Sequence, residues 1–377
     1  MRDALGAAKQ RLAREIVSNC ALPNQPIVAD PWVISSLLQK SIRRSETEIA
    51  QRAALTFFKL RGTAIWRRLM VIAFEDVGIG NLDAVTTTVA VASDSAWRKS
   101  HAGDLRLAIH LAGLLAAVPK DRSADYLCDA RDHPMLADFW RAMETASLES
   151  SLSHVRGQAL GLPQRAVAAL SALGIGSRGD ISRGTGGLEA LLTTFRELEV
   201  PEELVAATGI AAARTRAPIT VMVPLIWLAA RKSENRACDR AVPHLVKADD
   251  VPLYALDKHT RLGREAIWRV ACENDSVRAC LARFVPARQR RSAAYVAAFY
   301  VDAAPVARRL MWDQSEALET FGIERDLVHA GVPAEGINPL LEVMRTNLDQ
   351  LNELRADILV RSQDSQAAIA GKRGSER

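Results

Sequence analysis

The chain has 377 residues and a formal net charge of +5, with 49% hydrophobic and 25% charged residues. This length allows two or three domains with sizeable cores, and the composition is that of a globular protein. The longest apolar run, residues 218–230, contains Pro224 and is too short to span a bilayer. We therefore expect a soluble, alanine-rich helical protein without a membrane partner, in which this run is a buried helix.

The cysteines and the N-terminus favour a cytoplasmic protein. The cysteines form an odd set without close pairs, which suits neither a disulfide framework nor a zinc site: Cys20, Cys128, Cys238, Cys272 and Cys280. Residues 1–17 are typical of an amphipathic helix with mixed charges and lack the apolar core of a secretory signal. We expect a reducing cytoplasm, no metal and no cofactor.

After a first helix over residues 1–20 and a proline-rich connection, residues 30–81 predict three short helices. The first begins at Asp30-Pro31, a capping carboxylate followed by proline at the first helical position. It ends in a basic cluster: Lys40, Arg43 and Arg44. Ser45 and Glu48 have the spacing of a capping box that begins the second helix, which Gly62 should end.

The third helix, residues 64–77, should be capped by Thr63 and buried over most of its surface. Ile65, Leu69 and Ile72 recur at spacings of three and four, and similar residues fill the flanking positions. Glu75 and Asp76 fall at its C-terminus, where the helix dipole disfavours each carboxylate by about 0.3–1 kcal/mol. Such a violation indicates a compensating partner.

The nearby arginines are the candidate partners for these two carboxylates: Arg43, Arg44, Arg67 and Arg68. One interpretation is a structural ion-pair network between packed helices. The other is a charged site that meets a partner molecule. Eight basic residues against two acidic ones between residues 40 and 68 keep open a phosphate or DNA contact by Lys40 and these arginines.

Several small clusters in this region resemble a known family. Residues 40–43, the Ser45 box, residues 66–69 and residues 75–78 are followed by residues 81–84 and by the turn of residues 117–120. In this order, over residues 30–131, they resemble the C-terminal helical region of the replication-associated recombination protein A family, clamp-loader-like AAA+ ATPases that act at stalled replication forks. The resemblance implies an oligomerisation role, with a separate ATPase or replication protein as a possible partner.

The chain departs from that family in one decisive motif. No G-x-x-x-x-G-K-[ST] sequence is present, so the loop and the lysine that hold nucleotide phosphates are absent. We therefore expect no ATPase activity from this chain, and no other catalytic constellation is recognisable.

Residues 157–187 are rich in glycine and predict a loop or linker. They include a formal G-x-G-x-x-G at residues 174–179. A dinucleotide site requires a preceding strand, whereas the preceding segment has the pattern of a helix. We therefore favour a linker that separates a helical domain at 30–156, preceded by an N-terminal helix and linker at 1–29, from a second helical domain at 188–377.

Two segments of the second domain carry candidate sites. Residues 257–264 contain polar side chains just before and inside the predicted start of a helix: Asp257, Lys258, His259, Arg261 and Arg264. They could form a phosphate site, a structural set that caps the helix and forms ion pairs, or a ligand or catalytic pocket. Farther along the chain, four arginines lie near aromatic residues in the sequence: Arg283, Arg288, Arg290 and Arg291. This pattern fits a groove that binds a nucleic-acid backbone, or alternatively a solvated helix start. A helix over residues 337–370 has an apolar seam that could bind a partner helix.

The sequence thus predicts an all-α protein of two helical regions joined by a glycine-rich loop. The first functional hypothesis is a non-enzymatic, DNA-associated accessory or oligomerisation protein linked to replication, recombination or repair, which forms homo-oligomers. The alternative hypothesis is an enzyme or a phosphate-ligand-binding protein with its site around residues 257–264.

Overall fold

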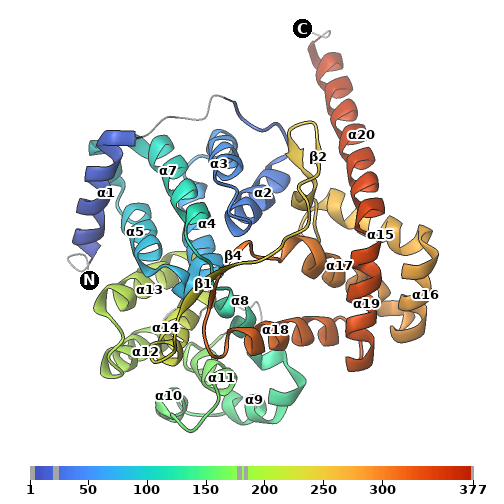
Figure 1. The fold of residues 1–377 in the computed structure, drawn as a ribbon. Helices are drawn as coiled ribbons and strands as arrows, with labels where there is room; N and C mark the ends of the chain where they lie inside the picture. The colour runs from blue at the N-terminus through green and yellow to red at the C-terminus, as the bar shows by residue number, and fades with distance from the viewer. Residues whose placement is uncertain (1–4, 20–24, 176–180, 182–185, 375–377) are drawn as a thin grey trace. The chain divides into compact units, whose positions relative to one another are not determined.

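The computed structural model describes residues 5–19, 25–175, 181 and 186–374. Most of these residues are helical, and the four strands are short and form two two-stranded sheets, which confirms the predicted all-α class (Figure 1). Two compact units are present: unit 1 comprises residues 1–25, 41–240 and 306–325, and unit 2 comprises residues 26–40, 241–305 and 326–377. None of the described helices has the length and apolar content needed to cross a bilayer.

Two helices have residues in both units, α2 (Pro31–Arg43) and α18 (Ser315–His329). The other elements of unit 1 are α1 (Gly6–Asn19), α3 (Thr47–Arg61), α4 (Ala64–Ile72), η2 (Ala73–Val77), η3 (Gly78–Gly80), α5 (Leu82–Ala92), α6 (Ser95–Ser100), α7 (Gly103–Ala117), α8 (Ser123–Cys128), η4 (Ala130–Asp132), η5 (Pro134–Leu136), α9 (Ala137–Glu144), α10 (Leu148–Arg156), α11 (Leu162–Ala172), α12 (Gly187–Glu197), α13 (Glu202–Thr215), α14 (Ile219–Ala230), β1 (Arg236–Asp239) and β4 (Arg308–Met311).

The remaining elements of unit 2 are β2 (Lys247–Ala248), β3 (Val251–Pro252), η6 (Leu253–Ala255), α15 (Arg261–Glu273), α16 (Asp275–Phe284), η7 (Ala287–Gln289), α17 (Arg290–Ala298), η8 (Phe299–Ala303), α19 (Ala334–Thr346) and α20 (Leu348–Gly374). Within unit 1, β1 pairs antiparallel with β4, with Arg236 opposite Met311. Within unit 2, β2 and β3 form a short hairpin.

The ends of α2 and α3 confirm some sequence predictions and correct others. Asp30 caps α2, because its Oδ1 accepts hydrogen bonds from the backbone N–H of Trp32 (2.7 Å) and of Val33 (3.1 Å). Gly62 ends α3 with a φ of +53°, as expected. The predicted capping box is wrong, because the N-cap residue of α3 is Glu46 and no side chain caps the helix. Ser45 lies one residue before the N-cap and has a φ of +59°.

Helix α4 forms the centre of unit 1. It packs against α3, α5, α7 and α13, and Ile65, Leu69 and Ile72 are fully buried. The predicted cap at Thr63 is wrong, since its side chain accepts no capping hydrogen bond. The apolar surface of residues 64–77 is therefore used inside the unit, and it gives no argument for self-association.

The helix that begins with α4 does not remain α-helical to residue 77. It changes into the π-helix η2 and then into the 3₁₀ turn η3. A π-turn is rare and is often found at functional sites. It carries Glu75 and Asp76, the two residues that the sequence marks as unusual at a helix end.

In unit 2, α15 packs against α16, α17 and α20, and α19 packs against α16 and α17. The predicted single helix over residues 337–370 is interrupted at Asn347, which separates α19 from α20. The side-chain amide of Asn347 donates to Val343 O (2.7 Å). Leu351 and Ile358 are buried, so much of the expected apolar seam is used within unit 2.

The glycine-rich stretch does not separate the two units. Helix α11 lies inside it, and α10, α11 and α12 pack against one another within unit 1. The chain instead crosses between units near residues 25, 40, 240, 305 and 325. Residues 176–180 and 182–185, which include most of the G-x-G-x-x-G sequence, lie outside the described residues.

Candidate functional site

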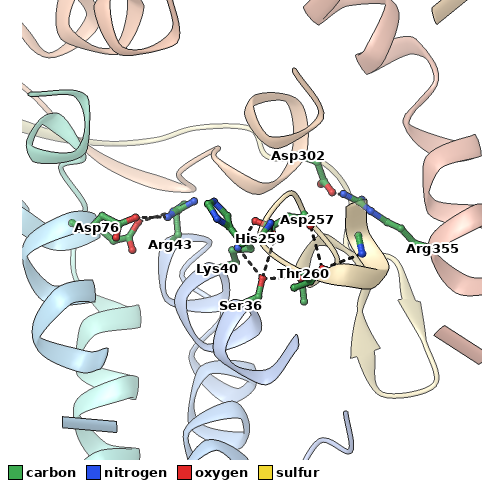
Figure 2. Close-up of polar contacts among 12 residues, drawn as sticks. Ser36, Lys40, Arg43, Asp76, Asp257, His259, Thr260, Asp302 and Arg355 are labelled. Atoms are coloured by element: carbon green, nitrogen blue, oxygen red, sulfur yellow. Dashed lines mark hydrogen bonds and ion pairs between the residues drawn. The ribbon is translucent and has the colours of Figure 1, made fainter. Parts of the chain in front are cut away.

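A buried cluster of carboxylates and arginines surrounds η2 in unit 1. Asp76 is fully buried, and its Oδ1 accepts a hydrogen bond from Arg43 Nε at 2.6 Å (Figure 2). Arg122 Nε lies 3.3 Å from the same oxygen. Glu75 Oε1 lies 3.3 Å from Arg43 Nη2, and Arg122 also pairs with Asp125. The predicted compensation of the two carboxylates is thus present, and Arg43 is one of the arginines expected for it.

Beside this cluster, the backbone of residues 77–80 contacts the backbone of residues 119–121, which are distant in the sequence. The N–H of Asp121 donates to Val77 O at 3.0 Å, so the turn after α7 lies directly against the end of η2. A Cβ at Gly78 would lie 2.7 Å from Asp121 O, and one at Gly80 would lie 2.5 Å from Pro119 O, so only glycine fits this approach. Residues 75–78 and 117–120, which carry part of the family resemblance, therefore meet in the folded unit.

Burial alters the protonation of the groups around this turn. Desolvation by burial, with the negative charge of Asp76, raises the pKa of Glu75 to about 7. Burial lowers the pKa of Lys120 to about 7, and its Nζ donates to Ala116 O at 2.9 Å and to Val118 O. Burial also raises the pKa of Asp121, whose Oδ2 accepts from Trp312 Nε1 at 2.9 Å. Lys120 and Asp121 are fully buried, so burial is the common cause of these shifts.

Three of the residues expected to contact phosphate are buried: Lys40, Arg43 and Arg44. Lys40 pairs with Asp257 at 2.7 Å, and Arg44 Nε lies 3.3 Å from Glu46 Oε1. Because these charged groups are enclosed and already paired, the geometry favours the structural ion-pair interpretation over phosphate contact by these three residues. Arg67 is exposed, and Arg68 is half-buried.

In unit 2, the segment at residues 257–264 is built around a buried ion pair (Figure 2). Asp257 Oδ2 lies 2.7 Å from Lys40 Nζ, and its Oδ1 accepts from the backbone N–H of His259 at 3.0 Å. Burial raises the pKa of Asp257, but its interactions with Lys40 and His259 outweigh the effect of burial, so the net shift is downward. Thr260, and not Asp257, caps α15, by accepting from Gly263 N at 3.0 Å.

His259 is exposed, and its ring meets the ring of Phe299 edge-on, with centroids 5.6 Å apart. Lys258 is half-buried, with Nζ 4.3 Å from the centroid of the same ring. Capping and ion pairing therefore account for Asp257 and Thr260, while His259 and Lys258 pack on an aromatic face.

Five arginines between α15 and α17 are exposed, and we call this set the basic surface: Arg261, Arg264, Arg283, Arg288 and Arg291. Arg261, Arg264 and Trp268 share one face of α15 by their spacing of three and four. The guanidinium of Arg291 lies 4.7 Å from the ring centroid of Trp268. Arg283 lies 4.9 Å from the Phe284 centroid.

Arg290 stands apart from this set, although the sequence groups it with its neighbours. It is half-buried and donates to Val285 O at 3.1 Å and to Ala282 O at 3.4 Å, across the end of α16. No member of the basic surface forms an ion pair within the described residues. Arg290 therefore joins α16 to α17, and its five neighbours stay available to a partner.

The sequence interpretation missed Arg122 as a partner of Asp76. A signal was present, because Lys120, Asp121 and Arg122 form a short charged run between two apolar helices. Charges in such a position are either solvated in a turn or buried in pairs, and only the fold distinguishes these outcomes.

No group of three or more His, Cys, Asp or Glu side chains that could hold a metal occurs in the described part of the chain. The four cysteines that the structure describes are free thiols: Cys128, Cys238, Cys272 and Cys280. Comparisons of the chain with protein-family models, with curated proteins and with solved structures found no match.

Proposed function

We propose that this protein is a non-enzymatic accessory protein of DNA replication, recombination or repair that contacts the DNA backbone through the basic surface of unit 2. The observation that carries the proposal is the set of exposed arginines on α15–α17. None of them is neutralised by an ion pair within the described residues, and two of them, Arg283 and Arg291, lie beside aromatic rings. The family resemblance of residues 30–131 supports the same proposed role in DNA replication, recombination or repair.

The physical argument rests on charge that is available to a partner. Surface arginines such as Arg141 and Arg345 form i,i+3 ion pairs with Asp138 and Glu342, so part of their charge is already offset. Those of the basic surface keep their guanidinium donors for an incoming group. Each phosphate that they neutralise would release counterions and make binding depend on salt.

The test compares two triple variants with equal charge change. Arg283→Ala, Arg288→Ala and Arg291→Ala together lower the net charge from +5 to +2, and so do Arg141→Ala, Arg196→Ala and Arg345→Ala. Binding to single-stranded, duplex and forked DNA is measured by fluorescence anisotropy over a range of salt concentrations. For duplex DNA, the first variant should flatten the logarithmic salt dependence by about 0.9 per lost contact, and the second should leave it unchanged.

The outcome decides between the two functional hypotheses. Equal effects of the two triple variants would show that only net charge matters and would remove the basic surface from the proposal. His259→Ala should leave DNA affinity nearly unchanged, since a neutral imidazole adds little to a phosphate interface. Loss of ligand binding or activity on His259→Ala, with the arginine variants intact, would support the alternative of a ligand or catalytic pocket at residues 257–264.

The resemblance further implies self-association and an ATPase supplied by another chain. Both belong to the proposal, and neither depends on the apolar residues of α4, which are buried within unit 1. The basic surface could act without either partner, so DNA binding and self-association are measured separately.

A further inference from the structure

A cavity of about 430 Å³ in unit 1 is lined by arginines. It lies beside α4, the end of α5, α6 and α13, and its charged lining consists of Arg67, Arg98 and Arg214. Thr63 and Trp66 contribute the other polar groups. No acidic residue belongs to the lining, so the cavity favours a negatively charged ligand.

Backbone carbonyls hold the three arginines in place. Arg98 is 5% exposed, and its Nη1 donates to the carbonyls of Val91 (2.8 Å) and Ala92 (3.0 Å) at the end of α5. Its Nε donates to Asp104 at 2.6 Å. A buried guanidinium with fixed partners is positioned before any ligand arrives, which reduces the entropy lost on binding.

The two exposed arginines are anchored in the same way. Arg67 Nη2 donates to Thr215 O, and Arg214 Nη2 donates to Ser93 O, each at 2.7 Å. Within the described residues neither guanidinium pairs with a carboxylate. Each guanidinium carries five N–H donors, so most of those on Arg67 and Arg214 remain available to a ligand.

Trp66 supplies an independent indication of a ligand. Its side chain is 4% exposed, lines the cavity, and its Nε1 has no hydrogen-bond acceptor among the described residues. The guanidinium of Arg98 lies 4.3 Å from its ring centroid. Buried N–H donors are almost always satisfied in folded proteins, and an anionic oxygen in the cavity would satisfy this one.

We infer that this cavity binds the phosphate group of a small phosphorylated molecule through Arg67, Arg98 and Arg214. The three guanidinium groups and the Asp104 carboxylate give a local charge of +2, which matches a phosphate monoester dianion better than a monovalent carboxylate. Guanidinium groups also fit the spacing of phosphate oxygens through paired N–H donors.

The space around the arginines fits a ligand larger than phosphate alone. Small-molecule sites typically measure about 300–1,000 Å³. A second cavity of about 460 Å³ shares Arg214 and is lined by apolar residues such as Leu5 and Ile210, by Ser93 and by the Lys9–Asp94 ion pair. We expect the part of the molecule beyond the phosphate group to extend toward this second cavity. This site lies in unit 1, so it does not depend on the DNA role proposed for unit 2.

The test uses the full chain and isothermal titration with inorganic phosphate, a sugar phosphate and adenosine monophosphate, with adenosine as the uncharged control. At least one phosphate ester should bind, and adenosine should not. Arg67→Ala with Arg214→Ala, at two exposed positions, should weaken that binding at least tenfold. The matched pair Arg141→Ala and Arg196→Ala should leave it unchanged, and Trp66→Phe, which removes the N–H donor and keeps an aromatic ring, should weaken it severalfold.

Three results would overturn the inference. The first is no binding of any phosphate ester at millimolar concentration, and the second is binding that is insensitive to Arg67→Ala with Arg214→Ala. The third is an oligonucleotide that binds through these two arginines while the small esters do not, which would assign the cavity to a nucleic-acid backbone. The triple variant at Arg283, Arg288 and Arg291 should retain ester binding, so failure of the DNA proposal and failure of this one are distinguishable.

Discussion

Replacing Asp76 by alanine tests whether the buried ion-pair cluster stabilises unit 1. Asp76 is fully buried, and the side chains of Arg43 and Arg122 are 2% and 1% exposed. The substitution leaves two enclosed guanidinium groups without their shared carboxylate. Removing one partner of a buried pair typically costs about 3–5 kcal/mol.

The structure places the expected cost near the lower end of that range. Arg43 keeps Glu75 at 3.3 Å, and Arg122 keeps its contact with Asp125. We therefore expect a loss of about 3 kcal/mol, which corresponds to a roughly 150-fold increase in the population of the locally open state.

Hydrogen exchange measured by mass spectrometry is the suitable assay, because a chain with two units need not unfold in one step. Peptides covering α4, η2 and α8 should exchange roughly 150-fold faster in Asp76→Ala. The control is Asp83→Ala, at a carboxylate that is 83% exposed and 3.0 Å from Arg11, where an exposed pair contributes at most about 1 kcal/mol. Exchange in Asp76→Ala that stays within about fivefold of the native rate would refute the assigned role.

The remaining predictions concern pH and self-association. The pKa of Glu75 is about 7 in the folded protein, against an ordinary value of 4.5, so the folded chain keeps a proton that the unfolded chain releases between these two values. Stability from this group is therefore present below pH 4.5 and is lost as the pH rises through 7. Glu75→Gln should remove this dependence. Hydrogen exchange of peptides covering η2 should show the stability of the variant increasing relative to that of the native protein by at most about 1.4 kcal/mol per pH unit across that interval, and a constant difference would contradict the assigned pKa. Light scattering from micromolar to tens of micromolar protein should show self-association, and a strict monomer would contradict that part of the proposed function.

The sequence alone determined the helical class and several of the helix ends. Asp30 before Pro31 and Gly62 after α3 act through their own backbone and nearest neighbours, so their effect can be read locally. The spacing of Ile65, Leu69 and Ile72 likewise gave the buried face of α4, because helical periodicity is a property of the segment itself. Glu75 and Asp76 were recognisable as unusual for the same local reason.

The tertiary structure decided which charges are buried. Arg43 and Arg291 both belong to short runs of basic residues, yet Arg43 is enclosed and Arg291 is exposed. The difference comes from Asp76, 33 residues away from Arg43, which the fold brings within 2.6 Å. A sequence pattern reports neighbours along the chain, whereas the desolvation and pairing of a charge depend on the segments that fold against it, so these ion pairs and the arginine cavity beside Trp66 were decided only by the packed structure.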